Sequence, residues 1–270
     1  KCVETGEGVL VTVHTVDSNE LERFQNAGFL VMSGVLSEDL CAQLRHAINT
    51  DLEQRVGPAE FEADVGYPGS PAARDGDGGD TPRRLLQAYA RNEIFKSLAQ
   101  HPLLVTWLKV LLDSAQPMLS QCHHNCVMTK HPGYSSATLW HQDIRYWSFE
   151  RPELISAWFA LGPEDAANGA LQVIPASHKQ SIDRGRLDSA QFLRPDLATN
   201  QALIESAQVV NLNAGDLLLF HCRLFHAAGQ NRSQQVKLSP VFTYHAADNH
   251  PIPGTRSERS PSIALERGGE

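Results

Sequence analysis

The chain has 270 residues, a formal net charge of −8 and no cluster of Lys or Arg, which argues against nucleic acid and anionic membrane surfaces as partners. No apolar run approaches the roughly 18 residues that a membrane-spanning helix needs. The five cysteines are odd in number and irregularly spaced, which argues against a disulfide framework and favours a reduced, cytoplasmic setting. No stretch dense in Pro, Gly or charge divides the chain, so we expect one domain over residues 1–270.

The first part of the chain, residues 17–113, is predicted to be a mostly helical buttress. One helix is expected to end at Gly28, and a second to begin at Ser37 after a short strand. Residues 83–112 also carry helical spacing of apolar side chains. We expect these helices to pack on one face of a sheet.

Residues 57–82 interrupt this region with many Gly, Pro, Asp and Ala residues, including the run from Asp75 to Asp80. Long loops in compact domains are usually either functional or disordered. Two interpretations are therefore open: a disordered surface loop, or a lid over the mouth of an active site.

From Met118 the pattern changes from helical to β, and residues 114–246 are predicted to form the core. Helices followed by a run of strands predict a mainly β fold, a double-stranded β-helix (jelly-roll, cupin-like) with a helical buttress. Residues 180–206 form a polar insertion, and residues 247–270 an irregular tail. The candidate strands are short and rich in β-branched and aromatic side chains: residues 118–130, 139–147, 154–161, 170–175, 207–211, 216–222 and 236–245.

Residues 139–146 are the most informative stretch, because they read as a strand that carries His141-Gln142-Asp143. Alternate residues of a strand share a face, so His141 and Asp143 are expected to point the same way, with Arg145 beside them. By itself a His-x-Asp pair is weak, since a surface pair or a buried hydrogen bond explains it equally well.

Residues 215–233 supply two further histidines, His221 and His226, at the end of an apolar strand. They are five residues apart, an odd step, so on a straight strand they face opposite ways. Two His and one carboxylate, with other coordination positions open, are the arrangement of non-haem Fe(II) oxygenases. The sequence therefore predicts a metal centre built from both segments.

Three segments in this order resemble the phytanoyl-CoA dioxygenase family: His141-Gln142-Asp143, the stretch 168–179 (Asn-Gly-Ala-Leu-Gln-Val-Ile-Pro-Ala-Ser-His-Lys) and residues 215–233. The resemblance covers residues 17–246 and implies a jelly-roll oxygenase that uses Fe(II), dioxygen and 2-oxoglutarate as cosubstrate. It also implies that His141, Asp143 and His226 are the catalytic metal ligands, because the family motif matches the histidine followed by Ala-Ala-Gly-Gln-Asn-Arg-Ser. An insertion such as 180–206 commonly borders the active site in this architecture.

Two positions depart from the family pattern. An Arg that pairs with the distal carboxylate of 2-oxoglutarate usually lies eleven residues after the distal His, and here that residue is Lys237. A hydroxyl residue often lies two after that His, and here it is Ala228. A lysine gives a point charge where an arginine gives a flat bidentate fork. We expect the cosubstrate to bind with altered affinity.

The resemblance implies further cosubstrate contacts. Trp158, Gln142 and Cys126 match positions on the cosubstrate side, and Arg84 or its neighbour Arg83 is expected to reach the site from the helical region. For Trp158 a plain core role is an equal alternative. Cys126 also belongs to a predicted strand whose Cys122 and His124 are expected to line one face rather than to bind zinc.

Two residues after the metal motif bear on the substrate. Arg145 is expected to point into the cavity and, if unpaired, to favour an anionic substrate, with Tyr146 forming a wall beside it. We expect a hydroxylase that acts on a C–H bond of a small organic molecule and releases succinate and CO2. The alternative is a metal-binding jelly-roll without oxygenase activity (an isomerase, a sensor or a degenerate family member), which the Lys237 and Ala228 departures favour. The sequence predicts no oligomeric state.

Overall fold

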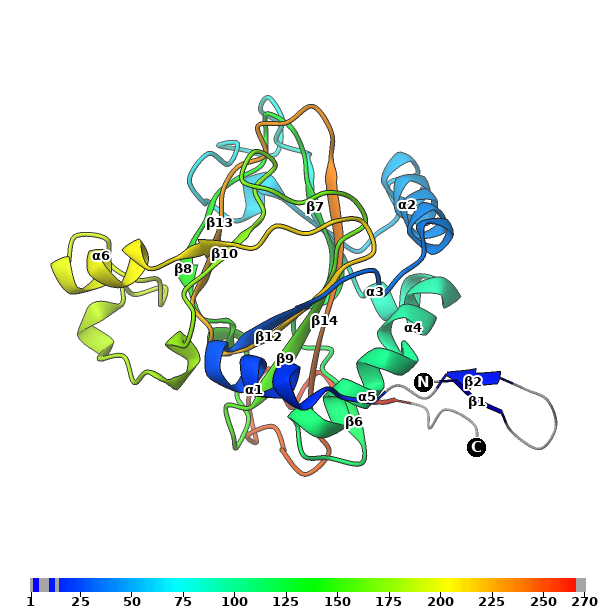
Figure 1. Ribbon diagram of the computed structural model, residues 1–270. Coiled ribbons are helices and arrows are strands. Elements are labelled where there is room, and N and C mark those ends of the chain that lie inside the picture. The colour runs from blue at the N-terminus through cyan, green and yellow to red at the C-terminus, as the bar shows by residue number, and fades with distance from the viewer. Residues whose placement is uncertain (1, 5–9, 13–14, 266–270) are drawn as a thin grey trace.

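The computed structural model describes residues 2–4, 10–12 and 15–265, with side chains from residue 15 onward. Two antiparallel sheets face each other across the interior (Figure 1). The small sheet consists, in spatial order, of β11 (Gln208–Val209), β10 (Leu171–Val173), β13 (His226–Ala228) and β8 (Thr138–His141). The predicted double-stranded β-helix is confirmed.

The large sheet contains most of the strands. Its spatial order is β3 (Phe29–Met32), β12 (Leu217–His221), β9 (Leu154–Phe159), β14 (Lys237–Ala246), β7 (Asn125–Lys130), β5 (Pro82–Leu86) and β4 (Ala59–Phe61). β6 (Pro117–Leu119) pairs with the end of β14, and β15 (Ile263–Ala264) pairs with β6. A separate hairpin joins β1 (Cys2–Glu4) to β2 (Leu10–Thr12).

Helices cover the outer face of the large sheet, as the sequence predicted. They are α1 (Ser18–Ala27), α2 (Glu38–Glu53), α3 (Ala88–Arg91), α4 (Glu93–Ala99) and α5 (Pro102–Leu111). Asp17 caps α1 by accepting from the backbone N–H groups of Asn19 and Glu20, and Gly28 ends it at φ 84°. α6 (Ala198–Glu205) lies beyond the small sheet (Figure 1).

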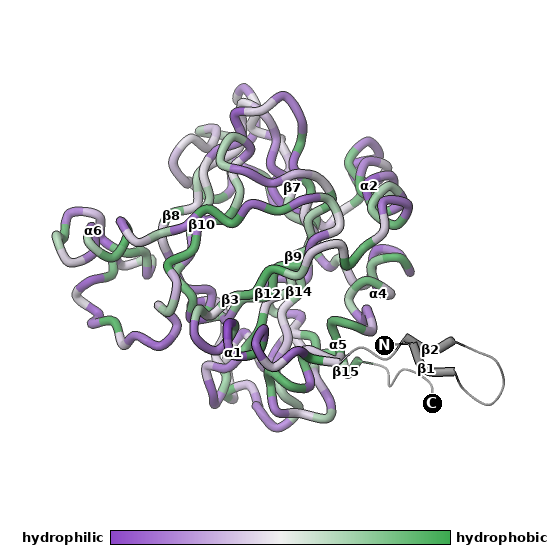
Figure 2. The backbone as a smooth tube through the Cα atoms, viewed as in Figure 1, coloured by the Kyte–Doolittle hydropathy of each residue, from purple (hydrophilic) through white to green (hydrophobic). Residues whose placement is uncertain are grey.

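The central strands β9 and β12 of the large sheet are mostly apolar, and both of their faces are buried. Every residue of β9 and of β14 is buried. On the outer side, Leu44 of α2 and Trp107 of α5 share one hydrophobic cluster with Phe159 and Leu217. Sheets covered on both faces carry near-continuous hydrophobic runs, and Figure 2 shows such runs along β9 and β12. This burial fixes the register of the strands that carry the site.

The predicted helix over residues 83–112 begins too early. Residues 82–86 form β5, which pairs with β7 through Arg84 opposite Met128 and Leu85 opposite Val127. The burial of β5 alternates with a period of two, which is the strand signature. The polar pair Arg83-Arg84 hid this alternation, and only the tertiary pairing with β7 decides it.

The segment 57–82 contains more regular structure than the sequence suggested. β4 pairs with β5, and the 3₁₀ helix η1 (Glu62–Asp64) follows it. An ion pair joins Arg55 to Asp80 across the segment at 2.8 Å. These contacts tie its two ends to the large sheet. The tail is likewise not wholly irregular, since β15 adds a strand to β6.

Further 3₁₀ helices are η2 (Asp143–Tyr146), η3 (Ser177–Lys179) and η4 (Arg184–Arg186). In the parts of the chain that the structure describes, every helix is too short or too polar to cross a bilayer.

Candidate metal centre and cosubstrate pocket

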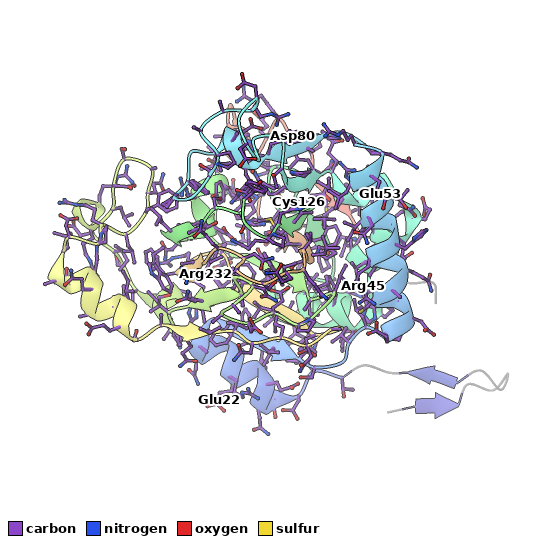
Figure 3. The ribbon with its side chains drawn as sticks, turned by 90° about the horizontal axis from the view of Figure 1, so that it is seen from above. Glu22, Arg45, Glu53, Asp80, Cys126 and Arg232 are labelled. Carbon is purple, nitrogen blue, oxygen red and sulfur yellow. The ribbon has the colours of Figure 1, made fainter. Side chains whose placement is uncertain are left out.

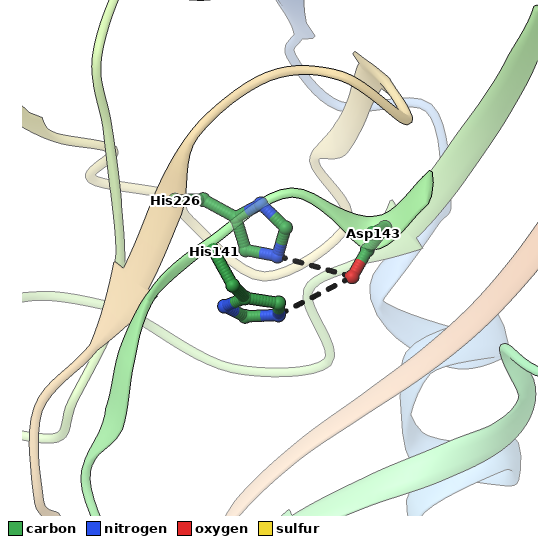
Figure 4. A group of neighbouring side chains, drawn as sticks. All are labelled: His141, Asp143 and His226. Atoms are coloured by element: carbon green, nitrogen blue, oxygen red, sulfur yellow. Dashed lines mark ion pairs between the residues drawn. The ribbon is translucent and has the colours of Figure 1, made fainter. Parts of the chain in front are cut away.

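Two neighbouring strands of the small sheet bring the candidate ligands together. β8 ends at His141, β13 begins at His226, and these two residues are direct partners in the ladder. The chain then turns into η2, which places Asp143 beside both rings (Figure 4). Asp143 Oδ1 lies 3.4 Å from His141 Nε2 and 3.4 Å from His226 Nε2. The structure thus assembles the three residues that the sequence singled out.

The hydrogen bonds of the two imidazoles fix which ring nitrogen is free. His141 Nδ1 donates to the carbonyl oxygen of Leu139 at 2.8 Å, and His226 Nδ1 donates to that of Leu224 at 3.0 Å. A carbonyl only accepts, so each ring carries a proton on Nδ1, which leaves Nε2 as the nitrogen that can bind a metal. Burial lowers the pKa of His141 to about 4, which keeps that ring neutral.

Lone pairs facing a carboxylate repel it unless a cation lies between them. Asp143 is fully buried, and its Oδ1, the oxygen that faces both rings, has no hydrogen-bond donor among the described residues. Buried polar atoms of this kind need an explanation. Three donor atoms within 4.8 Å of one another, two imidazole nitrogens and one carboxylate oxygen, fit a divalent transition metal. Backbone carbonyls behind metal-bound histidines are the usual means of orienting them.

A third histidine lies behind the carboxylate. His124 Nε2 lies 3.2 Å from Asp143 Oδ2. The rings of His141 and His226 contact the other oxygen, Oδ1. Although burial alone would raise the pKa of Asp143, the nearby His124 holds it well below its usual range. Burial would likewise lower the pKa of His124, but the Asp143 carboxylate outweighs it and raises that pKa to about 9. His124 therefore holds the second oxygen of Asp143.

The expectation that Arg145 shares a strand face with Asp143 is wrong. The strand ends at His141, and residues 143–146 form η2 instead. Arg145 consequently does not line the cavity, and its guanidinium lies 4.2 Å from the centre of the Phe192 ring. Phe192 belongs to the polar insertion 180–206 and also packs against His141 at 5.6 Å between ring centres, so this insertion borders the site as the resemblance implied.

His221 stays apart from the metal centre. It ends β12 in the large sheet, and its Nδ1 accepts a hydrogen bond from the backbone N–H of Arg223 at 3.1 Å. The cluster of candidate ligands contains His226 and not His221. The choice that the resemblance made between the two histidines agrees with this placement.

A cavity of about 280 Å³ lies between the two sheets and is lined by His141 and His226. We call the cluster of His141, Asp143 and His226 the metal end of the site. Farther along β13, at Ala228, the lining includes Lys130 of β7, Lys237 of β14 and Trp158 of β9. Lys130 and Lys237 are direct partners in the β7–β14 ladder. We call these two lysines, with Glu164, the lysine end.

Lys237 lies in the pocket as expected, but it is not a free cation. Its Nζ lies 2.9 Å from Glu164 Oε2 and 3.3 Å from Ser239 Oγ. The other oxygen of Glu164 accepts from Ser239 Oγ at 2.6 Å and from Trp158 Nε1 at 3.0 Å. The Glu164 side chain is 1% exposed, and that of Lys237 is 4% exposed. Buried charges are tolerated only when paired in this way.

The remaining predicted cosubstrate residues divide into two groups. Trp158 and Arg84 line the cavity, and Arg84 is held there by ion pairing with Glu60. Gln142 does not line it, because its side-chain amide donates to the backbone carbonyl of Arg223. Cys126 does not line it either: it is buried in a hydrophobic cluster with Trp158 and lies in the interior in Figure 3.

Of the two predicted substrate contacts, Tyr146 lines the cavity and Arg145 does not. Tyr146 stacks on the ring of His123 at 3.7 Å between ring centres. Arg256, from the predicted irregular tail, and Tyr67, from the 57–82 segment, also line the cavity. Residues 57–82 thus form part of its wall.

Sequence reasoning missed several residues of the site: Lys130, Glu164, Ser239, Arg256 and the role of His124. Lys130 and Glu164 have no motif around them, and only strand pairing brings them near Lys237. His124 was expected to line a strand face, but β7 begins one residue later, and the left-handed φ of 46° at His124 turns its ring toward Asp143. The sequence offered one signal for the role of His124: two adjacent histidines, His123 and His124, directly before a buried strand.

Known proteins share this sequence pattern and this architecture. The sequence model of the phytanoyl-CoA dioxygenase family (PhyH) matches residues 24–239. Ectoine dioxygenase from Halomonas elongata is 25% identical over 269 residues, covering 93% of this chain and 76% of that protein.

Two solved structures have a similar fold. EctD from S. alaskensis with 2-oxoglutarate and 5-hydroxyectoine has a TM-score of 0.71 at 22% identity, over 94% of this chain and 88% of that one. The epimerase SnoN in complex with Fe3+, alpha ketoglutarate and nogalamycin RO has a TM-score of 0.70 at 20% identity, over 93% and 95%.

A jelly-roll with two histidines on its small sheet and one carboxylate on the turn that follows β8 defines the class, that of the mononuclear non-haem metal oxygenases. Because the family model spans most of its length, the chain belongs to the phytanoyl-CoA dioxygenase family of Fe(II)- and 2-oxoglutarate-dependent oxygenases.

Proposed function

We propose that this member of the family hydroxylates a C–H bond of a small, polar organic molecule and converts 2-oxoglutarate to succinate and CO2. The observation that carries the proposal is the metal end. Two imidazole Nε2 atoms and a buried carboxylate oxygen without a hydrogen-bond donor among the described residues converge on one point. When bound there, iron with 2-oxoglutarate and dioxygen supplies the oxidant that breaks the C–H bond.

The protein's own residues contribute orientation and exclusion of water. The carbonyl oxygens of Leu139 and Leu224 lock the rings of His141 and His226, so that their free nitrogens stay aimed at the metal. His124 holds the outer oxygen of Asp143, which leaves the inner oxygen for the metal. Three ligands from the chain leave the other coordination positions open for cosubstrate and dioxygen.

A carboxylate at residue 143 also favours hydroxylation. In related halogenases, by the family resemblance, a small residue takes this position and leaves room for chloride. Asp143 is fully buried and in contact with both histidines. Similar folds also support other outcomes, as the epimerase SnoN does.

The cavity limits the size of the substrate. Small-molecule sites typically have volumes of about 300–1,000 Å³, and this cavity, at about 280 Å³, must hold cosubstrate and substrate together. We therefore propose a compact substrate. Its polar contacts would be Tyr146, Tyr67 and Arg256, and Arg256 would take the role that was expected of Arg145. Among the described residues Arg256 bonds only to the carbonyl of Cys122, at 2.7 Å, and so can take an anionic group.

We further propose a cytoplasmic setting and a freely diffusing substrate. Cys41, Cys122, Cys126 and Cys222 are buried free thiols, which a reducing compartment preserves. None of these four cysteines is paired in a disulfide.

A second candidate is a metal-binding protein without oxygenase activity. One observation favours it: Glu164 already neutralises Lys237, the residue expected to receive the distal carboxylate of 2-oxoglutarate. This candidate predicts metal binding without succinate formation.

Anaerobic reconstitution with Fe(II) and 2-oxoglutarate tests the two candidates. We expect the weak visible charge-transfer band of a metal-chelated 2-oxo acid in the parent protein and no band in His226→Ala. On admission of oxygen, succinate should form in the parent alone. Bound iron without a band or succinate would establish the second candidate and overturn the first.

A further inference from the structure

The lysine end contains a second cation that neither the motifs nor the resemblance identifies. Lys130 Nζ donates to the carbonyl oxygens of Ser136 at 2.9 Å and Gly229 at 2.5 Å. An ammonium has three donors, so one remains. Among the described residues no carboxylate oxygen lies within ion-pairing distance of Lys130, whereas Lys237 is paired with Glu164.

Lys130 restores the net charge that the family's arginine would supply. The family anchor, an arginine, would carry one positive charge. Here Lys130 and Lys237 carry two when both are protonated, and Glu164 removes one, so the fully protonated lysine end has the same net charge of one. Ser239 also supplies a hydroxyl where Ala228 lacks one, although it donates to Glu164 at 2.6 Å.

The path of the Lys130 side chain is shaped by a glycine. Gly169 lines the cavity with φ +75°, and a Cβ built on it would lie 2.8 Å from Lys130 Cδ and 2.4 Å from the Gly229 carbonyl oxygen. A residue with any side chain at 169 would therefore displace Lys130. The missing side chain leaves room for the ammonium beside the small sheet.

The spacing along β13 suits a short dicarboxylate. Lys130 contacts Gly229, which follows the metal-ligand candidate His226 by three residues. Three residues of extended chain span about 10 Å. A five-carbon 2-oxo dicarboxylate whose keto acid lies at the metal end can reach the lysine end with its other carboxylate.

We propose that Lys130 and Lys237 together form the anchor for the distal carboxylate of the cosubstrate, with Glu164 holding Lys237 and offsetting one of the two charges. This inference rests on the proposed function. Lys130 acts as a positioning and specificity residue: it selects 2-oxo acids that carry a second carboxylate and does not take part in the oxidation.

The electrostatics around Lys130 agree with this role. Burial, followed by the positive charge of Lys237, lowers the pKa of Lys130 to about 7. Arg83 acts in the same direction, and Glu62 and Glu164 oppose it. A carboxylate placed beside Lys130 would favour its charged form, so binding of the cosubstrate near neutral pH should take up a fraction of a proton.

The test compares two ligands that differ only at the distal end. Binding of 2-oxoglutarate and of 2-oxopentanoate, which lacks the second carboxylate, is measured by calorimetry on the anaerobic Fe(II) protein. Lys130→Met should weaken 2-oxoglutarate binding by about 10- to 100-fold, the worth of a hydrogen bond to a charged group. Binding of 2-oxopentanoate should not change, which also shows that the variant is folded and holds metal.

Glu164→Gln is the matched variant, and its effect on 2-oxoglutarate affinity should be opposite to that of Lys130→Met. Its amide NH2 cannot accept from Lys237, so the lysine is released toward the cavity and a competing charge is removed. We expect 2-oxoglutarate to bind more tightly, with 2-oxopentanoate again unchanged.

Proton uptake gives a third, independent readout. Calorimetry at pH 7.5 in two buffers of different ionisation enthalpy should show uptake with 2-oxoglutarate in the parent protein, and none in Lys130→Met or with 2-oxopentanoate. If the parent binds 2-oxoglutarate but Lys130→Met keeps the same preference between the two ligands, the anchor is overturned while the proposed function stands. If the iron-loaded parent binds neither ligand, the proposed function itself fails.

Discussion

The two ends of the cavity solve the problem of buried polar groups in opposite ways. At the metal end, His141, Asp143 and His226 bring lone pairs and a carboxylate together without a neutralising partner among them. At the lysine end, Glu164 and Lys237 already satisfy each other through a contact of 2.9 Å. The first is preorganised for a ligand that the chain does not supply, and the second is complete before any ligand arrives.

This difference separates affinity from selectivity. Groups left unpaired in the folded protein gain a full partner when a metal binds, so the metal end should dominate binding energy. A buried ion pair contributes less, since desolvation offsets much of its attraction. The lysine end should therefore tune which 2-oxo acid binds, and also stabilise the fold.

The largest effect is expected from a substitution at the metal end. His226→Ala should lower Fe(II) affinity by more than about 100-fold, because even the outer partners of ligands are worth 10–100-fold. Metal content after anaerobic dialysis measures this. His221→Ala is the control, because that residue lies outside the cluster of ligands. Equal loss in both variants would mean that the distal ligand has been misassigned.

At the lysine end the largest effect should be on stability. Lys237→Met leaves the Glu164 carboxylate buried without its cation, which should cost about 3–5 kcal/mol in the free energy of unfolding. Urea denaturation measures it. Adding Glu164→Gln should recover much of the loss, because an amide oxygen still accepts from Trp158 and Ser239. A cost below about 1 kcal/mol, the range of exposed pairs, would contradict the buried pair.

The smallest expected effect is on how the free energy of unfolding of the metal-free protein depends on pH. Lys130 has a pKa of about 7 in the folded chain, lowered by burial and by Lys237, whereas an unfolded lysine titrates near 10.4. Between these values the unfolded chain binds more protons, so stability should rise with pH from about 7 to 10.

Urea denaturation at several pH values should show this rise in the parent and a flatter profile in Lys130→Met. Identical profiles would mean that Lys130 is solvated and charged in the empty protein.

Much of the fold was predictable from local pattern, and the failures have physical causes. The strands of the core carry apolar runs, and the caps at Ser37 and Gly28 mark helix ends. Residues 83–86 were assigned to a helix, because two arginines mask a strand whose partner, β7, lies forty residues later. Periodicity reports local burial and carries no information about such pairing.

The metal ligands were predictable for another reason. His141 and Asp143 are close in sequence, and the flanking motif identifies His226. Their side-chain orientation was not predictable: a strand was expected through residue 146, but η2 begins at Asp143. That turn directs Asp143 to the histidines and sends Arg145 to Phe192 instead of the cavity.

The sequence by itself determined the class of fold, the three candidate ligands and the family, because each depends on residues grouped in short motifs. Tertiary structure alone decided how the far end of the pocket is charged. Lys130, Glu164 and Lys237 are separated by more than thirty residues each, and they meet only through the β7–β14 ladder and the turn after β9. Electrostatic partners depend on distance in space, and a sequence lists only distance along the chain.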